Sequence, residues 1–206
     1  QLDLQGAEHL EVALGGESAA TAAFDIPRLP FQDGTDVLQS ALARMRGLET
    51  LRTEELLSPP WPPIRTVYAF EGPDRMEWQS STGEAAALLG RTNYTREGSA
   101  SPWKIEQLAR SFTVPIFIWD EGPPLNAALL GQETLDSVDT QVVSFFENVD
   151  GSIWFRVWIS ADGLAHRSQM GAQGHLMDVR YYDYDASFKL DPPTDAPSAA
   201  EGPTVP

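Results

Sequence analysis

The sequence predicts an α+β protein in which one amphipathic helix packs on a large antiparallel sheet that curls around it. Three observations support this prediction. A single stripe of apolar residues at helical spacing lies within residues 35–47. About nine or ten segments with the character of strands follow it at hairpin spacing. The last of them, within residues 151–193, are joined by the shortest turns, which favours neighbouring antiparallel strands.

The three closing strands show the clearest pattern in the chain. Residues 152–160 are rich in Ile, Trp, Phe and Val, which suit a half-buried pleated surface. An Ala-Asp-Gly turn leads into residues 164–172, and a Gln-Gly turn leads into residues 175–183. Gly favours both turns because it adopts positive φ without steric cost.

A two-residue turn at Gln173-Gly174 would fix which residues face one another. It would place Met170 opposite Met177, Ser168 opposite Val179, and His166 opposite Tyr181. Alternation then separates an apolar face from a solvated one. The apolar face would carry Leu164, His166, Ser168, Met170, Ala172, His175, Met177, Val179 and Tyr181. The solvated face would carry Arg167, Gln169, Asp178, Arg180 and Tyr182.

Residues 35–47 are predicted to form the helix. Its apolar stripe consists of Val37, Leu38, Ala41, Leu42 and Met45. Thr35 is the expected N-cap, because its hydroxyl can accept a hydrogen bond from an orphan backbone N–H, and Gly47 is a natural end. We expect Leu38 and Leu42 to be buried against the sheet, since the stripe has no other apolar surface to meet.

Most of the chain between the helix and the closing strands is predicted to be extended. The expected strands cover residues 49–57, 64–71, 75–81, 84–94, 132–138 and 140–147, with a further short alternation at Trp103 and Ile105. The second and third of these form a hairpin around a Gly-Pro-Asp turn. The Ala-Leu run of the fourth is also compatible with a short helix.

Three segments between the strands are expected to be irregular. Residues 58–63 contain four prolines, which exclude a regular strand, and Trp61 among them is expected to pack onto the domain; a polyproline ligand is the alternative. Residues 112–119 are intensely apolar but contain Pro115, which indicates an edge strand or an irregular cover over the core. Residues 125–130 are expected to form one helical turn.

We expect three parts along the chain. Residues 1–34 form an arm or linker, in which Leu2-Asp3-Leu4 and residues 10–14 alternate and can add a short strand. Residues 35–193 form the domain, and residues 194–206 form a Pro-rich acidic tail. The chain begins with Gln, so we expect it to come from a longer precursor or protein.

Composition excludes several functional classes. The chain has 206 residues, with 14 Lys and Arg against 30 Asp and Glu, so its net charge is −16. This charge repels phosphate backbones, and we expect no nucleic-acid partner. The absence of Cys removes disulfides, thiolate catalysis and zinc fingers. The longest strongly apolar run, residues 114–119, is too short to cross a bilayer.

Few residues indicate a reaction or a metal. The sequence has three His and lacks the G-x-S-x-G pattern, so we expect no enzyme and no cofactor. Asp183 and Asp185 are a carboxylate pair that more simply caps a turn. A weak alternative is a copper(I) site, because thioether and imidazole suit that soft ion. Its residues would be His166, Met170, His175 and Met177.

Several short motifs resemble the lipoprotein-carrier superfamily, which includes LolA-like, LppX–LprG-like and RseB-like proteins. The residues that carry the resemblance are Val157-Trp158-Ile159, Asp162-Gly163, Tyr182-Asp183-Tyr184, Phe188-Lys189-Leu190 and Pro192-Pro193, together with 131–134 and 139–143. The resemblance covers about residues 35–193. It implies an unclosed half-barrel with a helical lid, an extracytoplasmic location and a cavity for acyl chains. The lipobox Cys of the lipoprotein members is absent, which puts a lipid anchor in doubt.

The resulting hypothesis is a non-catalytic module that shields a lipid or other hydrophobic molecule in a pocket between the helix and the sheet. The alternative is a sensory or interaction domain of a membrane protein, of the copper-resistance type or another, with a filled core. Attachment to a membrane protein or anchor fits both. Residues 58–63 and 112–130 would form the mobile rim of the pocket. The ligand would contact Leu38, Leu42, Met45, Trp78, Phe117, Trp119, Trp158, Met170 and Met177.

Overall fold

The computed structural model describes residues 9–14, 20–25, 32–120, 122–147 and 153–196. The chain divides into two compact units, residues 1–32 and residues 33–206. The first unit contains an antiparallel hairpin of β1 (His9–Leu14) and β2 (Ala20–Asp25), in which His9 pairs with Asp25. The strand expected within residues 10–14 is therefore present, whereas Leu2-Asp3-Leu4 lies outside the described residues.

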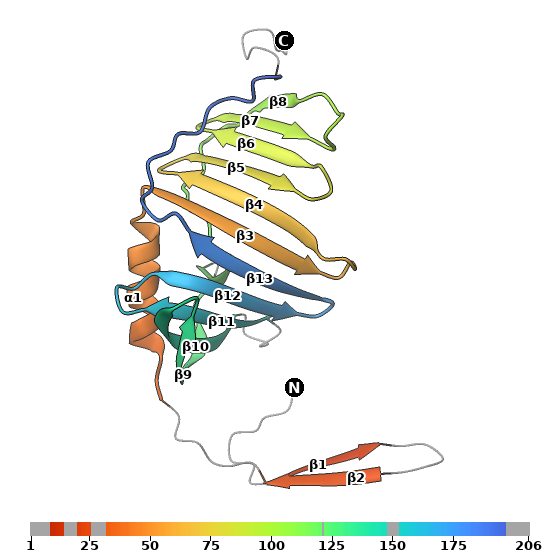
Figure 1. Ribbon diagram of the computed structural model, residues 1–206, viewed down its shortest axis with the longest axis vertical. Coiled ribbons are helices and arrows are strands. Elements are labelled where there is room, and N and C mark those ends of the chain that lie inside the picture. Colours follow the sequence, from red (N-terminus) through yellow and green to blue (C-terminus); the bar gives the residue numbers. More distant parts are fainter. Residues whose placement is uncertain (1–8, 15–19, 26–31, 121, 148–152, 197–206) are drawn as a thin grey trace. The chain divides into compact units, whose positions relative to one another are not determined.

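The second unit contains one helix and one sheet of eleven antiparallel strands (Figure 1). The helix is α1 (Thr35–Arg46). The strands are β3 (Thr50–Ser58), β4 (Ile64–Glu71), β5 (Arg75–Ser80), β6 (Ala85–Leu89), β7 (Thr92–Arg96), β8 (Lys104–Gln107), β9 (Leu125–Leu135), β10 (Val138–Glu147), β11 (Ile153–Ser160), β12 (Ala165–Ala172) and β13 (His175–Tyr182). A short 3-10 helix, Ile118–Asp120, precedes β9.

The strand order makes the sheet a meander that is joined at its middle. From one edge to the other it runs β8-β7-β6-β5-β4-β3-β13-β12-β11-β10-β9. Every neighbouring pair except β3 and β13 is consecutive in sequence, so short turns connect most of the sheet. The pairing of β13 with β3 brings the last strand beside the first one after the helix. The edges β8 and β9 do not meet, and the unit is the predicted unclosed half-barrel with an N-terminal helix.

The helix packs on one face of the sheet, which we call the inner face. Its stripe residues Leu38, Ala41, Leu42 and Met45 are buried. They join a core with inward-facing strand residues such as Val143, Phe155 and Val157. Figure 1 shows that α1 runs across the strand direction, so its stripe meets several neighbouring strands. The expected burial of Leu38 and Leu42 is confirmed.

The helix begins at the predicted residue, Thr35, but its N-cap differs from the expected one. Gly34 is the N-cap, and the Thr35 N–H donates to the Asp33 carboxylate at 2.9 Å, so the expectation that Thr35 caps the helix is wrong. A Cβ on Gly34 would lie 2.9 Å from the Val143 side chain. Glycine therefore allows the helix to start in close contact with the sheet. The predicted end is confirmed, because the Gly47 N–H caps the last turn.

The closing hairpins have the predicted register. Met170 pairs with Met177 and Ser168 with Val179, as a two-residue turn requires. Met170, Ser168 and Val179 are buried. Their alternates Arg167 and Asp178 form an ion pair on the other side of the sheet, which we call the outer face.

Three predictions about the connecting segments need correction, and one alternative is decided. Residues 125–130 belong to β9 and not to a helical turn, because pairing with β10 satisfies their backbone. Residues 84–94 form two strands, β6 and β7, with Gly90 at positive φ in the turn between them. Residues 112–117 are irregular, which is the second of the two alternatives expected for this segment. Trp61 is 87% exposed and does not pack onto the domain, since its four neighbouring prolines hold the loop away from the sheet.

None of the helices in the described part of the chain has the length and apolar content that crossing a bilayer requires.

Replacing Leu42 by Ala should lower the free energy of unfolding by about 2–5 kcal/mol, because it leaves a cavity between α1 and the sheet. Trp61→Ala is the matched control, and its effect should stay within about 0.5 kcal/mol because Trp61 is exposed. Urea unfolding measures both values. An equally small effect of Leu42→Ala would show that the helix does not stabilise the sheet.

Candidate functional site

The inner face contains an apolar pocket that α1 does not cover. Its volume is about 300 Å³, at the lower end of the range for small-molecule sites. Its lining comes from β3, β4, β5, β13 and the segment of residues 116–118, which ends in the first residue of the 3-10 helix. The lining residues are Thr53, Glu55, Tyr68, Phe70, Met76, Ile116, Phe117, Ile118, Met177, Val179 and Tyr181. None of them belongs to α1, so the pocket lies beside the helix-covered core and not between helix and sheet as expected.

Strand register sets the floor of the pocket in two rows. In one row Thr53 of β3 lies between Tyr68 of β4 and Tyr181 of β13. In the next row, two residues along β3, Glu55 lies between Thr66 and Val179. Side chains two residues apart on a strand point to the same face. The row of three hydroxyl residues, Tyr68, Thr53 and Tyr181, which we call the hydroxyl row, and the Glu55 carboxyl therefore both face inward. The floor is thus polar at a few points and apolar elsewhere.

The irregular segment of residues 112–120 covers part of this floor. Phe117 is buried, with its ring centroid 5.5 Å from that of Trp119 and 6.1 Å from that of Tyr181. The Trp119 indole N–H donates to the Tyr181 hydroxyl at 2.9 Å, and that hydroxyl lies 2.7 Å from the Ser168 hydroxyl. Ile116, in contrast, is 46% exposed. The segment is therefore anchored at Phe117 and Trp119 and open to solvent at Ile116.

The carboxyl group of Glu55 is the one acidic group of the pocket lining. Burial raises its pKa above the ordinary value, because the apolar surroundings disfavour the charged form. Among the residues that the structure describes, Glu55 has neither a hydrogen bond nor an ion pair. Burial also raises the pKa values of Tyr68 and Tyr181 to about 12 each, so both remain protonated at neutral pH.

The residues predicted to contact a ligand fall into several places. Phe117 and Met177 line the pocket. Trp119 and Met170 are buried in the core, as are the three helix residues Leu38, Leu42 and Met45. Trp78 lies on the inner face beside pocket residue Tyr68, with ring centroids 6.5 Å apart.

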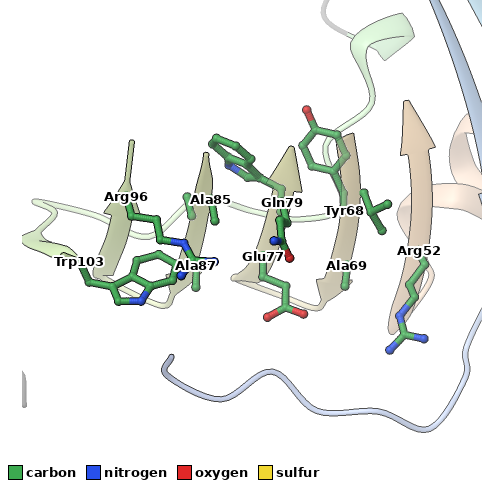
Figure 2. Close-up of a pocket in the computed structure, with 12 residues that line it drawn as sticks. Arg52, Tyr68, Ala69, Glu77, Gln79, Ala85, Ala87, Arg96 and Trp103 are labelled. Atoms are coloured by element: carbon green, nitrogen blue, oxygen red, sulfur yellow. The ribbon is translucent and has the colours of Figure 1, made fainter. Parts of the chain in front are cut away.

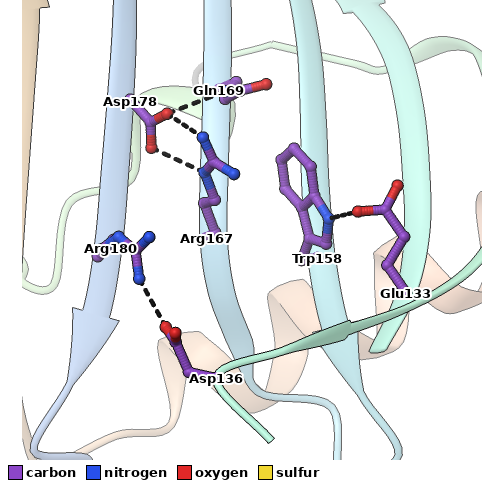
Figure 3. A network of polar contacts seen from close by, with 7 residues as sticks. All are labelled: Glu133, Asp136, Trp158, Arg167, Gln169, Asp178 and Arg180. Atoms are coloured by element: carbon purple, nitrogen blue, oxygen red, sulfur yellow. Dashed lines mark hydrogen bonds and ion pairs between the residues drawn. The ribbon is translucent and has the colours of Figure 1, made fainter. Parts of the chain in front are cut away.

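Trp158 lies on the outer face, away from Met170 and Met177. It pairs with Arg167, whose guanidinium stacks 4.9 Å from its ring centroid. Figure 3 shows the surrounding network, in which the Trp158 indole N–H donates to Glu133 at 2.7 Å and Arg167 pairs with Asp178. The indole N–H of Trp158 therefore already has a hydrogen-bond partner on the outer face.

A second hollow, of about 250 Å³, lies at the alanine-rich strands β4 to β7. Figure 2 shows Tyr68 on one side of these strands and Glu77, Ala87 and Trp103 on the other. The Arg96 guanidinium stacks 4.8 Å from the Trp103 ring centroid, and Trp103 donates to Asp195 at 2.8 Å. The charged groups of this lining are exposed, as Glu77 is, or pair with residues outside it, as Arg52 does with Asp183 and Arg96 with Asp195, so this hollow is a weaker candidate than the inner pocket.

The hairpin does not bring the four residues of the copper hypothesis together. Met170 and Met177 pair directly, and His175 is exposed at the turn. His166 lies four residues before Met170, about 13 Å along the strand, and its ring nitrogen is 2.9 Å from the Ser160 hydroxyl. Within the described ranges, no group of three or more His, Asp or Glu side chains is arranged to hold a metal ion.

The carboxylates of Asp183 and Asp185 stabilise the turn after β13. Asp185 accepts from the Glu49 N–H at 2.8 Å, and this hydrogen bond, more than the nearby Arg44, lowers its pKa. Asp183 pairs with Arg52. Both residues have positive φ, which Asp tolerates better than most residues.

No protein-family model matches the chain, and no curated protein matches it in sequence. Among solved structures, LprF from Mycobacterium bovis is similar with a TM-score of 0.56 and 14% identity, over 80% of this chain and 97% of LprF. The lipoprotein LppX from Mycobacterium tuberculosis is similar with a TM-score of 0.51 and 12% identity, over 76% of this chain and 97% of LppX. The chain has an LprF-like and LppX-like fold. At such low identity the likeness concerns the fold alone.

Sequence reasoning missed Glu55 and its hydroxyl neighbours Thr53 and Tyr68. One signal was present, because alternation in the predicted strand 49–57 places Glu55 on the same face as Leu51 and Leu57. A carboxyl on an apolar face is uncommon and indicates a special environment. The neighbours Val179 and Tyr181 were not predictable, since they depend on the pairing of β3 with β13.

Glu55→Gln should raise the free energy of unfolding at neutral pH and have little effect in acid. The folded protein binds the Glu55 proton more tightly than the unfolded chain does, so stability falls as pH rises through the unfolded and then the folded pKa. The amide of Gln does not ionise, so the variant does not lose stability as pH rises. Urea unfolding from about pH 4 to pH 8 measures the difference, with Glu77→Gln on the exposed outer face as control. A pH-independent difference would contradict the buried carboxyl.

Proposed function

We propose that this domain is an extracytoplasmic, non-catalytic binding module that holds a lipid or other hydrophobic molecule in the inner pocket. The observation that carries the proposal is the apolar lining of a half-barrel floor that the helix leaves uncovered. Its apolar residues are Phe70, Met76, Ile116, Ile118, Met177 and Val179. The fold shared with LprF and the lipoprotein LppX supports it.

The size of the pocket limits the binding affinity that apolar contact alone can provide. A ligand that buries about 300 Å² of apolar surface gains about 7 kcal/mol at 25 cal/mol per Å². Loss of translational and rotational freedom offsets at least about 4 kcal/mol of this. The remainder of about 3 kcal/mol corresponds to a millimolar or weaker dissociation constant. Useful affinity therefore needs either more apolar contact or a specific polar one.

The segment of residues 112–120 is the proposed entrance. Two backbone hydrogen bonds of this segment are formed by the Val114 N–H with Pro73 and the Asp120 N–H with Phe117, at 2.8 and 3.1 Å. Phe112 and Ile116 are exposed, so a small outward movement uncovers more of the floor without breaking a strand. The rim proposed from the sequence is thereby shortened to residues 112–120 and does not include the strand residues 125–130. The proline-rich loop 58–63 remains its other proposed part.

A second candidate is a sensory or interaction domain of a membrane protein. The packed half of the inner face beneath α1 favours it, because Leu38 and Met45 leave no accessible space. The exposed Trp61, in the loop between β3 and β4, and Leu176, in β13 opposite Ser58, provide apolar surface for a partner. Attachment to a membrane protein or anchor is compatible with either function.

Met177→Trp should abolish saturable displacement of a fluorescent fatty acid without loss of stability, because the larger side chain fills the pocket that Met177 lines. Met170→Trp is the matched control from the paired strand position. Since Met170 is buried in the core, overpacking there should lower the free energy of unfolding by about 1–3 kcal/mol. Fluorescence titration and urea unfolding measure both variants. Absence of saturable binding in the wild type would favour the second candidate.

A further inference from the structure

We infer that the pocket selects a hydrophobic ligand with a protonated amine, which pairs with the carboxylate of Glu55. This inference rests on the proposed hydrophobic-ligand function and specifies its ligand class. It starts from the position of Glu55 in the lining, two residues along β3 from the hydroxyl row. Val179 on one side and Leu57 further along the strand provide the apolar surface that the rest of the ligand would contact.

Among the residues that the structure describes, none supplies a cation to this carboxylate. The arginines on β3, β4 and β13 face the outer side of the sheet, where each pairs with another acid. Within the described residues these pairs are Arg52 with Asp183, Arg65 with Glu54, and Arg180 with Asp136. Adjacent residues on a strand point to opposite faces of the sheet. The side chain of Glu54 therefore meets Arg65 on the outer face, whereas the side chain of Glu55, on the inner face, meets no cation among the described residues.

An ammonium group has donors for more than one acceptor of this floor. It carries three N–H bonds and can bind the Glu55 carboxylate and a hydroxyl oxygen together. The hydroxyl of Tyr68 has no hydrogen-bond partner among the described residues, and after burial the charge of Glu55 is the second cause that raises its pKa. Burial raises the pKa of Glu55 because the apolar surroundings disfavour its charged form. A cation bound next to the carboxylate stabilises that charged form.

The charge of the whole chain favours the same class of ligand. A net charge of −16 attracts cations and repels anions at long range. A fatty-acid carboxylate placed next to Glu55 would add a like charge at short range, which is unfavourable. A neutral alcohol of the same length would keep the apolar contact and lose the charge-assisted hydrogen bond. The three head groups are therefore expected to bind in the order amine, alcohol, carboxylate.

Competition among three ligands with the same twelve-carbon chain tests this order. Dodecylamine, dodecanol and dodecanoate displace the uncharged probe N-phenyl-1-naphthylamine from the intact chain at about pH 7, where the amine is protonated, below their micelle concentrations. Dodecylamine should compete at about one tenth of the dodecanol concentration or less. Dodecanoate should be the weakest competitor.

The variants locate the effect at Glu55. In Glu55→Gln, dodecylamine and dodecanol should compete within about twofold of each other, and dodecanol should bind as in the wild type. Glu77→Gln removes the same charge from the exposed outer face and should keep the amine advantage. Glu55→Asp keeps the negative charge and should retain part of the advantage of dodecylamine over dodecanol.

Two results would overturn the inference while leaving hydrophobic binding in place. One is equal competition by all three ligands in the wild type, and this result decides even if a variant fails to fold. The other is an amine advantage that survives in Glu55→Gln as it does in Glu77→Gln. If the wild type binds neither the probe nor any competitor, the proposed function and this inference fall together.

Discussion

The pairing of β13 with β3 is the constraint on which the rest of the structure depends. It connects two meanders, β3 to β8 and β9 to β13, into one sheet. It also builds the pocket floor, because it places Val179 and Tyr181 beside Glu55 and Thr53. Without this pairing each meander would expose a long edge and a bare apolar face, which natural sheets avoid.

The pocket follows from a mismatch between the helix and the sheet. A helix of twelve residues is about 18 Å long. Eleven strands at 4.8 Å spacing give a sheet about 48 Å wide. A single helix that runs across the strands therefore covers about four of them. The α1 residues that face these strands are buried in the core, and the irregular segment of residues 112–120 covers part of the remaining inner face. Incomplete cover by irregular chain is what leaves apolar floor accessible.

Charged side chains pair with one another on the outer face of the sheet, whereas the acid on the inner face has no such partner among the described residues. This difference determines which ligands the pocket can bind. On the outer face, arginines and carboxylates of neighbouring strands pair, as Arg167 does with Asp178 and Arg65 with Glu54. On the inner face, Glu55 has no such partner among the described residues, and burial raises its pKa. A floor with one unpaired acid can distinguish head groups, whereas a purely apolar floor distinguishes mainly size and shape.

The sequence by itself determined the elements whose causes are local. The stripe that contains Leu38 and Leu42 specified the helix and its buried side, and the Gln173-Gly174 turn specified that Met170 faces Met177. Glu55, Trp61 and residues 125–130 depended on the tertiary structure. A strand partner more than a hundred residues away gave Glu55 its surroundings, pairing with β10 made residues 125–130 a strand, and the prolines around Trp61 hold it away from any surface. Helix and turn preferences act over a few residues, whereas long-range pairing decides which residues become neighbours across a sheet.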